Sequence, residues 1–185
     1  MKLIAMDLQK RLVNECLYNF QHFLENTEKI IDAARENGIE VIYVQHDNGP
    51  GSGFSQGDED FEIASQFLPL AGEKRFSKHH GSCFGSPELR KYLEQAGEDT
   101  VMLVGLITDG CVDTTVKSGF DRGYHMIIPS GTNSTFDNEY MTGETACRFF
   151  NEGLWPDYFA KCVSVEEAIA LMKQQSRLNQ EETIL

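Results

Sequence analysis

The chain has 185 residues, and its 29 Asp and Glu outweigh its 16 Lys and Arg, giving a formal net charge of −13 at pH 7. This balance argues against a nucleic-acid partner, because binding to phosphates needs a basic surface. Apolar residues make up 41% of the chain, which is ordinary for a globular protein and enough for one buried core. We expect a single domain over 1–185, with its core over about 2–173 and a peripheral tail at 176–185.

Membrane and export signals are not apparent in the sequence. No stretch approaches the roughly 20 apolar residues of a membrane-spanning helix, and the apolar run at 2–8 is too short for a signal peptide. The five cysteines are scattered and lack a C-x-x-C pair, which is typical of reduced cytosolic thiols rather than of a disulfide framework or a structural zinc site. We therefore expect a cytoplasmic protein with no membrane partner.

Short apolar runs alternate with amphipathic segments along the chain. The predicted strands, in chain order, are 2–8, 39–46, 74–77, 100–106, 124–130 and 159–163, of which the third and the last are the weaker two. The predicted helices are 20–38, 86–97, 111–123 and 164–175. This alternation predicts a mainly parallel sheet of about six strands with helices on both faces, a doubly wound three-layer α/β/α domain of Rossmann-like type.

Helix-ending and helix-starting residues agree with these boundaries. Pro87 stands at the first position of its helix, and Ser164-Val-Glu-Glu is a capping box. Gly38, Gly97 and Gly123 each follow a predicted helix, where a left-handed residue commonly ends it.

Polar side chains follow several of the predicted strands. Asp7 ends the first strand, His46 the second, and Cys111 comes shortly after the strand at 100–106, while Lys78 follows the weaker strand at 74–77. Ligands of such sheets bind at the carboxyl ends of the strands. The fold is therefore expected to bring an acid, a base, an ammonium and a thiol to one edge.

Cys111 has the surroundings expected of a nucleophile. It begins a predicted helix, where the helix dipole and free N–H groups are expected to lower the pKa of a thiol. Lys78 would stabilise the thiolate further, and Asp7 could accept the thiol proton. Two alternatives stay open: a thiol redox protein that pairs Cys111 with Cys83, and a binding protein of the same fold without turnover.

Several segments together resemble the isochorismatase-like cysteine hydrolases, a family that includes nicotinamidases and other small-amide hydrolases. These segments are AMDLQ at 5–9, the lysine with HHGSCF at 78–84, GLITDGCVDTT at 105–115 and DRGYHMII at 121–128. The resemblance runs from about residue 2 to residue 173 in the same strand–helix order. Its most specific part is the G-x-x-T-x-x-C-V segment.

The resemblance implies a catalytic triad of Asp7, Lys78 and Cys111; Lys74, the rival lysine, fits the motif less well. It also implies a non-proline cis peptide just before Ile107. The backbone N–H groups of Ile107 and Cys111 would then form the oxyanion hole. The family further implies a homo-oligomer with the dimer as its smallest unit.

The same resemblance implies hydrolysis of a C–N bond in a small amide or ureido-type substrate through a thioester, without a cofactor. Nicotinamidases carry an Asp-x-His and further histidines that bind a metal, whereas this chain has His46 followed by Asp47 and no second histidine nearby in sequence. We therefore expect neither a metal nor nicotinamide. Isochorismatases proper cleave a vinyl ether without this thiol, so Cys111 argues against that chemistry. The candidates for substrate contact are Gln9, His46, Asn48 and Phe84.

Overall fold

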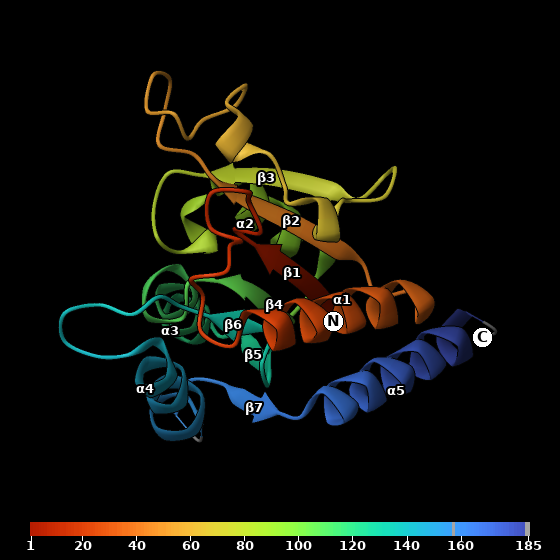
Figure 1. Cartoon of the computed structure of the whole chain (residues 1–185). Helices are drawn as coiled ribbons and strands as arrows, with labels where there is room; N and C mark the ends of the chain where they lie inside the picture. Colours follow the sequence, from red (N-terminus) through yellow and green to blue (C-terminus); the bar gives the residue numbers. More distant parts are fainter. Residues whose placement is uncertain (157, 184–185) are drawn as a thin grey trace.

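A computed structural model describes residues 1–156 and 158–183 (Figure 1). Within these ranges the centre is a seven-stranded sheet in the order β3-β2-β1-β4-β5-β7, with β6 paired to β4. The strands of this sheet pair with one another in parallel. The strands are β1 (Lys2–Met6), β2 (Val41–His46), β3 (Lys74–Lys78), β4 (Thr100–Leu106), β5 (His125–Pro129), β6 (Asn133–Ser134) and β7 (Lys161–Val163).

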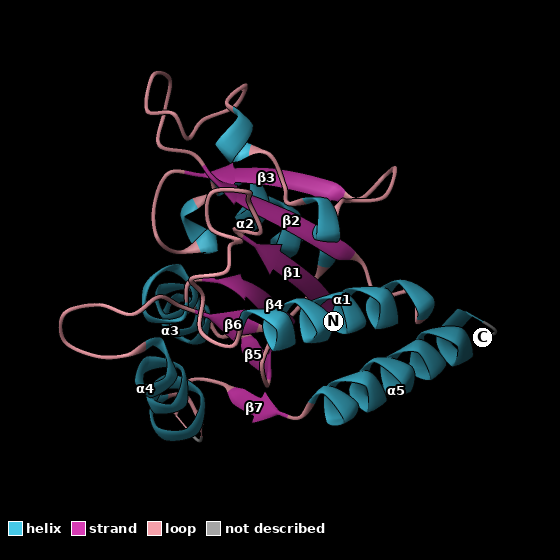
Figure 2. Cartoon of the chain, viewed as in Figure 1, coloured by secondary structure: helices cyan, strands magenta, loops and turns pink. Residues whose placement is uncertain are grey.

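Helices cover both faces of the sheet (Figure 2). One core contains Leu3 and Ala5 of β1 together with apolar residues of α1 (Phe20–Glu36) and α5 (Val165–Thr183). The opposite core contains Ile4 and Met6 with apolar residues of α2 (Pro87–Ala96) and α3 (Asp113–Asp121). Because β1 is buried on both faces, its residues form a continuous apolar run rather than an alternating one. The predicted doubly wound α/β architecture is confirmed.

All six predicted strands are present, including the weaker two at 74–77 and 159–163. The sequence prediction missed the two-residue strand β6, and it also missed α4 (Gly143–Arg148), which continues into a π-helical turn, Phe149–Leu154. No helix in the described part of the chain is long and apolar enough to cross a membrane.

The tail predicted at 176–185 falls mostly within a helix. Helix α5 continues to Thr183, because neither glycine nor proline follows Ser164 to stop it; residues 184 and 185 lie outside the described part. The capping box that starts α5 is confirmed: the Ser164 N–H donates to Glu167 Oε2 at 2.8 Å, and the Glu167 N–H donates to Ser164 Oγ at 3.1 Å.

Gly105 allows the two central strands to come together beside the site. It pairs with Met6 and has a φ of +136°, and a Cβ built on it would lie 1.9 Å from the Met6 carbonyl oxygen. No side chain fits in that space. The next residue after Met6 is Asp7, so this close approach fixes where the Asp7 carboxylate stands relative to β4.

We predict that Gly105→Ala prevents folding or lowers the free energy of unfolding by more than about 3 kcal/mol, because the methyl group collides with backbone. The matched control is Gly97→Ala, at the left-handed end of α2 with φ +65° and nothing within 4 Å of the new carbon. There we expect a loss of about 1–2 kcal/mol from backbone strain alone. Urea unfolding of both variants measures the difference, and equal losses would contradict the crowding argument.

Candidate active site

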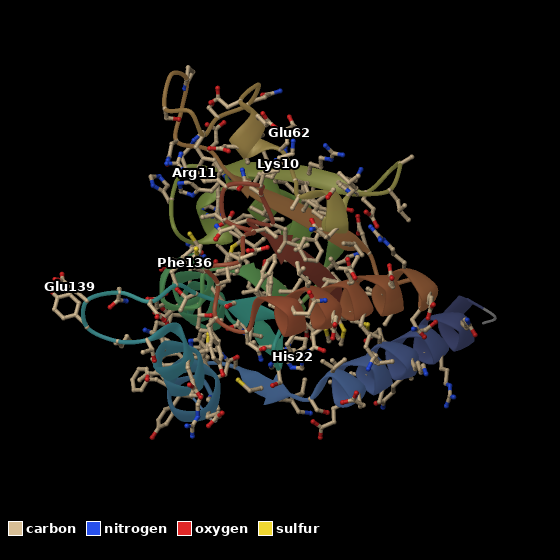
Figure 3. All side chains as sticks on the ribbon, viewed as in Figure 1. Lys10, Arg11, His22, Glu62, Phe136 and Glu139 are labelled. Atoms are coloured by element: carbon tan, nitrogen blue, oxygen red, sulfur yellow. The ribbon has the colours of Figure 1, made fainter. Side chains whose placement is uncertain are left out.

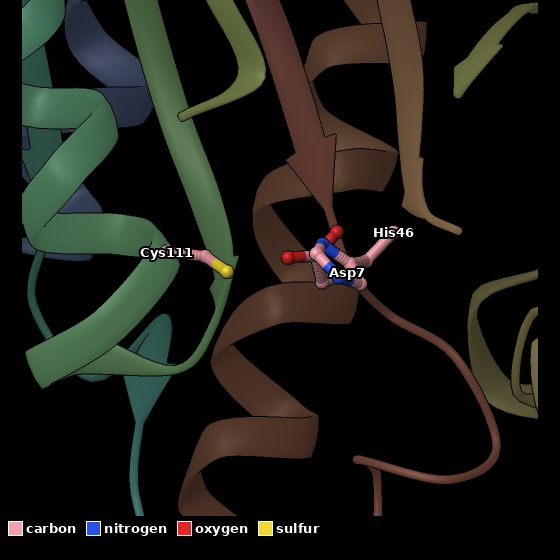
Figure 4. A group of neighbouring side chains, drawn as sticks. All are labelled: Asp7, His46 and Cys111. Carbon is pink, nitrogen blue, oxygen red and sulfur yellow. The ribbon is translucent and has the colours of Figure 1, made fainter. Parts of the chain in front are cut away.

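The carboxyl ends of adjacent strands gather the predicted site residues. Asp7 follows β1, His46 ends β2 and Lys78 ends β3, and His46 and Lys78 are direct partners in the register of the sheet. Cys111 comes from the turn at Thr108–Val112, after β4 and before α3. Figure 4 shows the Cys111 sulfur and the Asp7 carboxylate pointing toward one another, with the His46 ring beside Asp7.

The Lys78 ammonium lies at the centre of this group. Its Nζ is 2.8 Å from Asp7 Oδ2 and 3.3 Å from Cys111 Sγ. It also lies 3.0 Å from His46 Nδ1 and donates to the His80 carbonyl oxygen at 3.1 Å. Both Asp7 and Lys78 are completely buried. The structure therefore brings together the acid, the ammonium and the thiol that the sequence pointed to, with His46 in contact with the ammonium.

Metal-binding groups are present, but an ammonium lies among them. Asp7, His46 and Cys111 each offer one ligand atom, and these atoms lie within 4.8 Å of one another. Lys78 Nζ contacts one atom from each of the three residues. In this position the Lys78 ammonium interacts with all three groups, so a metal ion would have to displace the Lys78 side chain.

Asp7 is held in conditions that suit a proton acceptor. Burial raises the pKa of its carboxyl group, and although the charge and hydrogen bond of Lys78 oppose this effect, the net shift is upward. Its backbone has a φ of +55°, a left-handed conformation that aspartate tolerates better than most residues. A carboxylate with a raised pKa takes a proton more readily than one in water.

The pKa of the Cys111 thiol differs from the sequence prediction. Burial raises its pKa to about 11, the negative charge of Asp7 adds to the rise, and the charge of Lys78 opposes it. The predicted lowering of this pKa is therefore wrong. Cys111 lies half-buried in the turn before α3, which begins at Asp113, and it faces a carboxylate as well as an ammonium. At neutral pH the thiol keeps its proton until a base removes it.

The loop that presents Cys111 has the predicted backbone. The peptide between Leu106 and Ile107 is cis, as the family resemblance implied. The Ile107 carbonyl accepts the N–H groups of Gly110 and Val112, both at 3.1 Å, which closes the turn around Cys111. The oxyanion hole formed by the N–H groups of Ile107 and Cys111 stays a prediction.

Two of the four predicted substrate contacts, Gln9 and Phe84, make contacts within the fold. Gln9 is fully buried; its amide donates to the carbonyls of His46 and Phe61, both at 3.0 Å, and accepts the His46 N–H at 2.8 Å. Phe84 is also fully buried, and its ring stacks on Tyr124 with 4.9 Å between centroids. Residue type alone did not show that these side chains are packed inside the protein, and their contact with a substrate stays a prediction.

The other two candidates form a chain that leads outward from the site. His46 is half-buried, and its Nε2 lies 2.8 Å from Oδ1 of the exposed Asn48. The His46 ring stacks on the Phe54 ring, with 6.1 Å between the ring centroids. The guanidinium of Arg11, a residue labelled in Figure 3, lies over the Phe54 ring, 5.2 Å from its centroid. No sequence pattern indicated Phe54 or Arg11, because both belong to irregular segments.

Comparison with known families decides the lineage. The family model "Isochorismatase domain" matches residues 2–167. The chain belongs to the isochorismatase family. Its fold is shared by a cysteine hydrolase from Pseudomonas syringae pv. phaseolicola, with a TM-score of 0.84 at 21% identity over 94% of this chain and 92% of that one.

Curated isochorismatase-family relatives match in part. A secreted isochorismatase effector of Verticillium dahliae is 30% identical over 60% of this chain and 58% of its own length. A nicotinamidase of Arabidopsis thaliana is 24% identical over 74% of each chain. A ureidoacrylate amidohydrolase of Serratia proteamaculans is 27% identical over 57% of this chain and 54% of its own. The chain thus spans less than two thirds of the length of the first and third of these proteins.

We predict that alkylation of Cys111 by iodoacetamide is slow at pH 7 and still accelerates above pH 10, because burial and Asp7 hold the thiol in its protonated form. Site-resolved mass spectrometry measures the rate at each pH and separates Cys111 from the exposed Cys16. Asp7→Asn removes the carboxylate that opposes ionisation, so its profile should move to lower pH. A wild-type midpoint below the ordinary value of about 8.5 would contradict this assignment.

We also predict that Lys78→Met destabilises the fold by about 3–5 kcal/mol, because it leaves the Asp7 carboxylate buried without a counter-charge. Adding Asp7→Asn to this variant should recover most of the loss, since the buried charge is then gone. Urea unfolding of the two single variants and the double variant measures the coupling. Purely additive losses would show that the pair does not act as a unit.

Proposed function

We propose that this protein is a cysteine hydrolase that cleaves a C–N bond of a small amide or ureido-type compound through a thioester. The observation that supports this most directly is the contact of a buried ammonium with both a carboxylate and a thiol, at 2.8 and 3.3 Å. Relatives named as a nicotinamidase and an amidohydrolase support the same class of reaction.

The reaction begins with a proton transfer inside the site. Asp7 takes the proton of the Cys111 thiol, and the sulfur attacks the substrate carbonyl carbon to form the C–S bond. Negative charge leaves the carboxylate and passes through sulfur to the carbonyl oxygen. The N–H groups of Ile107 and Cys111 would bind that oxygen, and one such donor is typically worth about 2.7–4 kcal/mol of barrier. Lys78 keeps its positive charge throughout.

The intermediate then collapses with the help of the same carboxyl group. Asp7 gives its proton to the leaving nitrogen, the C–N bond breaks and an amine or ammonia departs. Asp7 next accepts a proton from a water molecule while the oxygen of that water attacks the thioester carbon. The C–S bond then breaks. The proton returns to sulfur, so one water is consumed and an acid is released. Asp7 acts in turn as base, acid and base.

The alternative redox function has little support. Cys83 is completely buried, and this burial raises the pKa of its thiol to about 12, which disfavours the thiolate that disulfide exchange requires. Both Cys83 and Cys111 are free thiols in the structure.

A screen of small amides, carbamates and ureides for ammonia release tests the hydrolase proposal. We expect turnover of at least one class, with Cys111→Ala lowering it by about 10⁴-fold or more, because the covalent step is lost. Cys83→Ala is the matched control and should keep most of the activity. For an active substrate, intact-mass measurement after acid quenching should show an acyl group on the wild-type chain. Unchanged turnover in Cys111→Ala would overturn the proposal.

A further inference from the structure

The Lys78 ammonium has more neighbours than protons. It carries three N–H groups and is closed off from water. The acceptors around it are His46 Nδ1, the His80 carbonyl, Asp7 Oδ2 and Cys111 Sγ. If His46 and His80 each take one N–H, a single N–H is left for the carboxylate and the thiol to share.

The protonation state of His46 follows from this contact. An ammonium only donates hydrogen bonds, so Nδ1 of His46 has to accept, and the imidazole is neutral with its proton on Nε2. That proton then points at Oδ1 of Asn48, which is 2.8 Å away. Asn48 is thus an acceptor that selects the tautomer in which Nδ1 is free to face Lys78.

The imidazole is held in place from several sides. The buried Gln9 amide bonds both the N–H and the C=O of His46, which fixes the backbone at the end of β2. The Phe54 ring stacks on the imidazole, and Arg11 covers that ring. The charged or titratable groups around the imidazole include Lys78, Asp7 and Cys111, with Arg11 beyond Phe54 and Asp47 next in the chain. A side chain so firmly fixed around one acceptor atom suits a precise orienting role.

We propose that His46 is a positioning residue of the active site, which orients the Lys78 ammonium so that its remaining N–H points between Asp7 Oδ2 and Cys111 Sγ. This proposal rests on the proposed hydrolase function. When the thiol proton moves to Asp7, negative charge moves from oxygen to sulfur. The shared N–H can follow it by a rotation of the ammonium small enough to keep the other two N–H groups within hydrogen-bond range of His46 and His80. Lys78 neither gains nor loses a proton in this step.

Removing the Nδ1 acceptor should disturb this balance in a defined direction. The ammonium would be free to turn fully toward Asp7, where it favours the charged carboxylate and leaves the sulfur protonated. A hydrogen bond to a charged group corresponds to a change of about 10- to 100-fold in an equilibrium. The thiolate population at a given pH should fall by a comparable factor.

The test compares His46→Leu with His46→Asn through the pH profile of Cys111 alkylation by iodoacetamide, a readout that needs no substrate. We expect His46→Leu to slow alkylation about 10- to 100-fold at pH 9 and to move the profile to higher pH. Asparagine places an amide oxygen near the position of Nδ1, so His46→Asn should recover most of the wild-type rate. His79→Leu is the matched control, because His79 is exposed at the same edge and bonds the Asp47 carbonyl instead of Lys78.

A third variant, His46→Gln, covers the case in which His46→Leu does not fold. Glutamine reaches toward the position of Nε2, so His46→Gln keeps polarity and size but offers nothing to Lys78 at the Nδ1 position. We expect His46→Gln to behave like His46→Leu and unlike His46→Asn. A wild-type profile in His46→Leu, or equal profiles for the asparagine and glutamine variants, would overturn the positioning role.

Turnover separates this proposal from the proposed function. With an active substrate, His46→Leu should lower kcat by a similar factor and leave KM nearly unchanged, because His46 acts on the proton transfer and not on binding. A silent substrate screen combined with a shifted alkylation profile would remove the hydrolase and keep the positioning role. Turnover with normal kcat in His46→Leu would remove the positioning role and keep the hydrolase.

Discussion

The ion pair between Asp7 and Lys78 is the interaction on which the rest of the site depends. Both groups are completely buried, and taking a charged group out of water costs several kcal/mol. Such a cost is tolerated only where nearby acceptors and a fixed geometry compensate it. The parallel strands supply the geometry, since β1, β2 and β3 end at the same edge. His46, the His80 carbonyl and Cys111 supply the remaining contacts of the ammonium.

The same pair determines how the thiol behaves. An ammonium alone would favour the thiolate, but its partner carboxylate and the burial of the sulfur together have the larger effect, so the pKa of Cys111 is raised to about 11. In the proposed mechanism, reactivity depends on moving one proton from Cys111 to Asp7, whose own pKa is also raised. The pKa values of the proton donor, Cys111, and of the acceptor, Asp7, are both raised by the buried surroundings that the two groups share.

The sequence predicts which residues meet at the site better than it predicts their pKa values. Apolar runs followed by Asp7, His46 and Lys78 are enough to place these residues at one edge, because parallel strands end together. The raised thiol pKa depends on burial by residues distant in sequence, which no local pattern contains. Gln9 has the same limitation: a polar residue after a strand can face a ligand or bond backbone, and only the packed structure shows the second.

The missed elements have physical reasons too. Strand β6 has two residues, which is too short for a periodicity to develop, and α4 at Gly143–Arg148 begins with glycine and has few apolar residues. Helix α5 runs beyond its expected end because a polar but helix-favouring composition continues past the apolar face. For β6 and α4 tertiary packing decides the structure, whereas local propensity extends α5.

The protonated state of Cys111 also bears on how long the nucleophile survives. Peroxides attack sulfur in its anionic form, and the sulfenic acid that results can be oxidised further to products that most cells do not reverse. A sulfur that stays protonated in the free protein gives such oxidants little opportunity to react. The burial that raises the pKa of Cys111 thereby protects the thiol from oxidative damage.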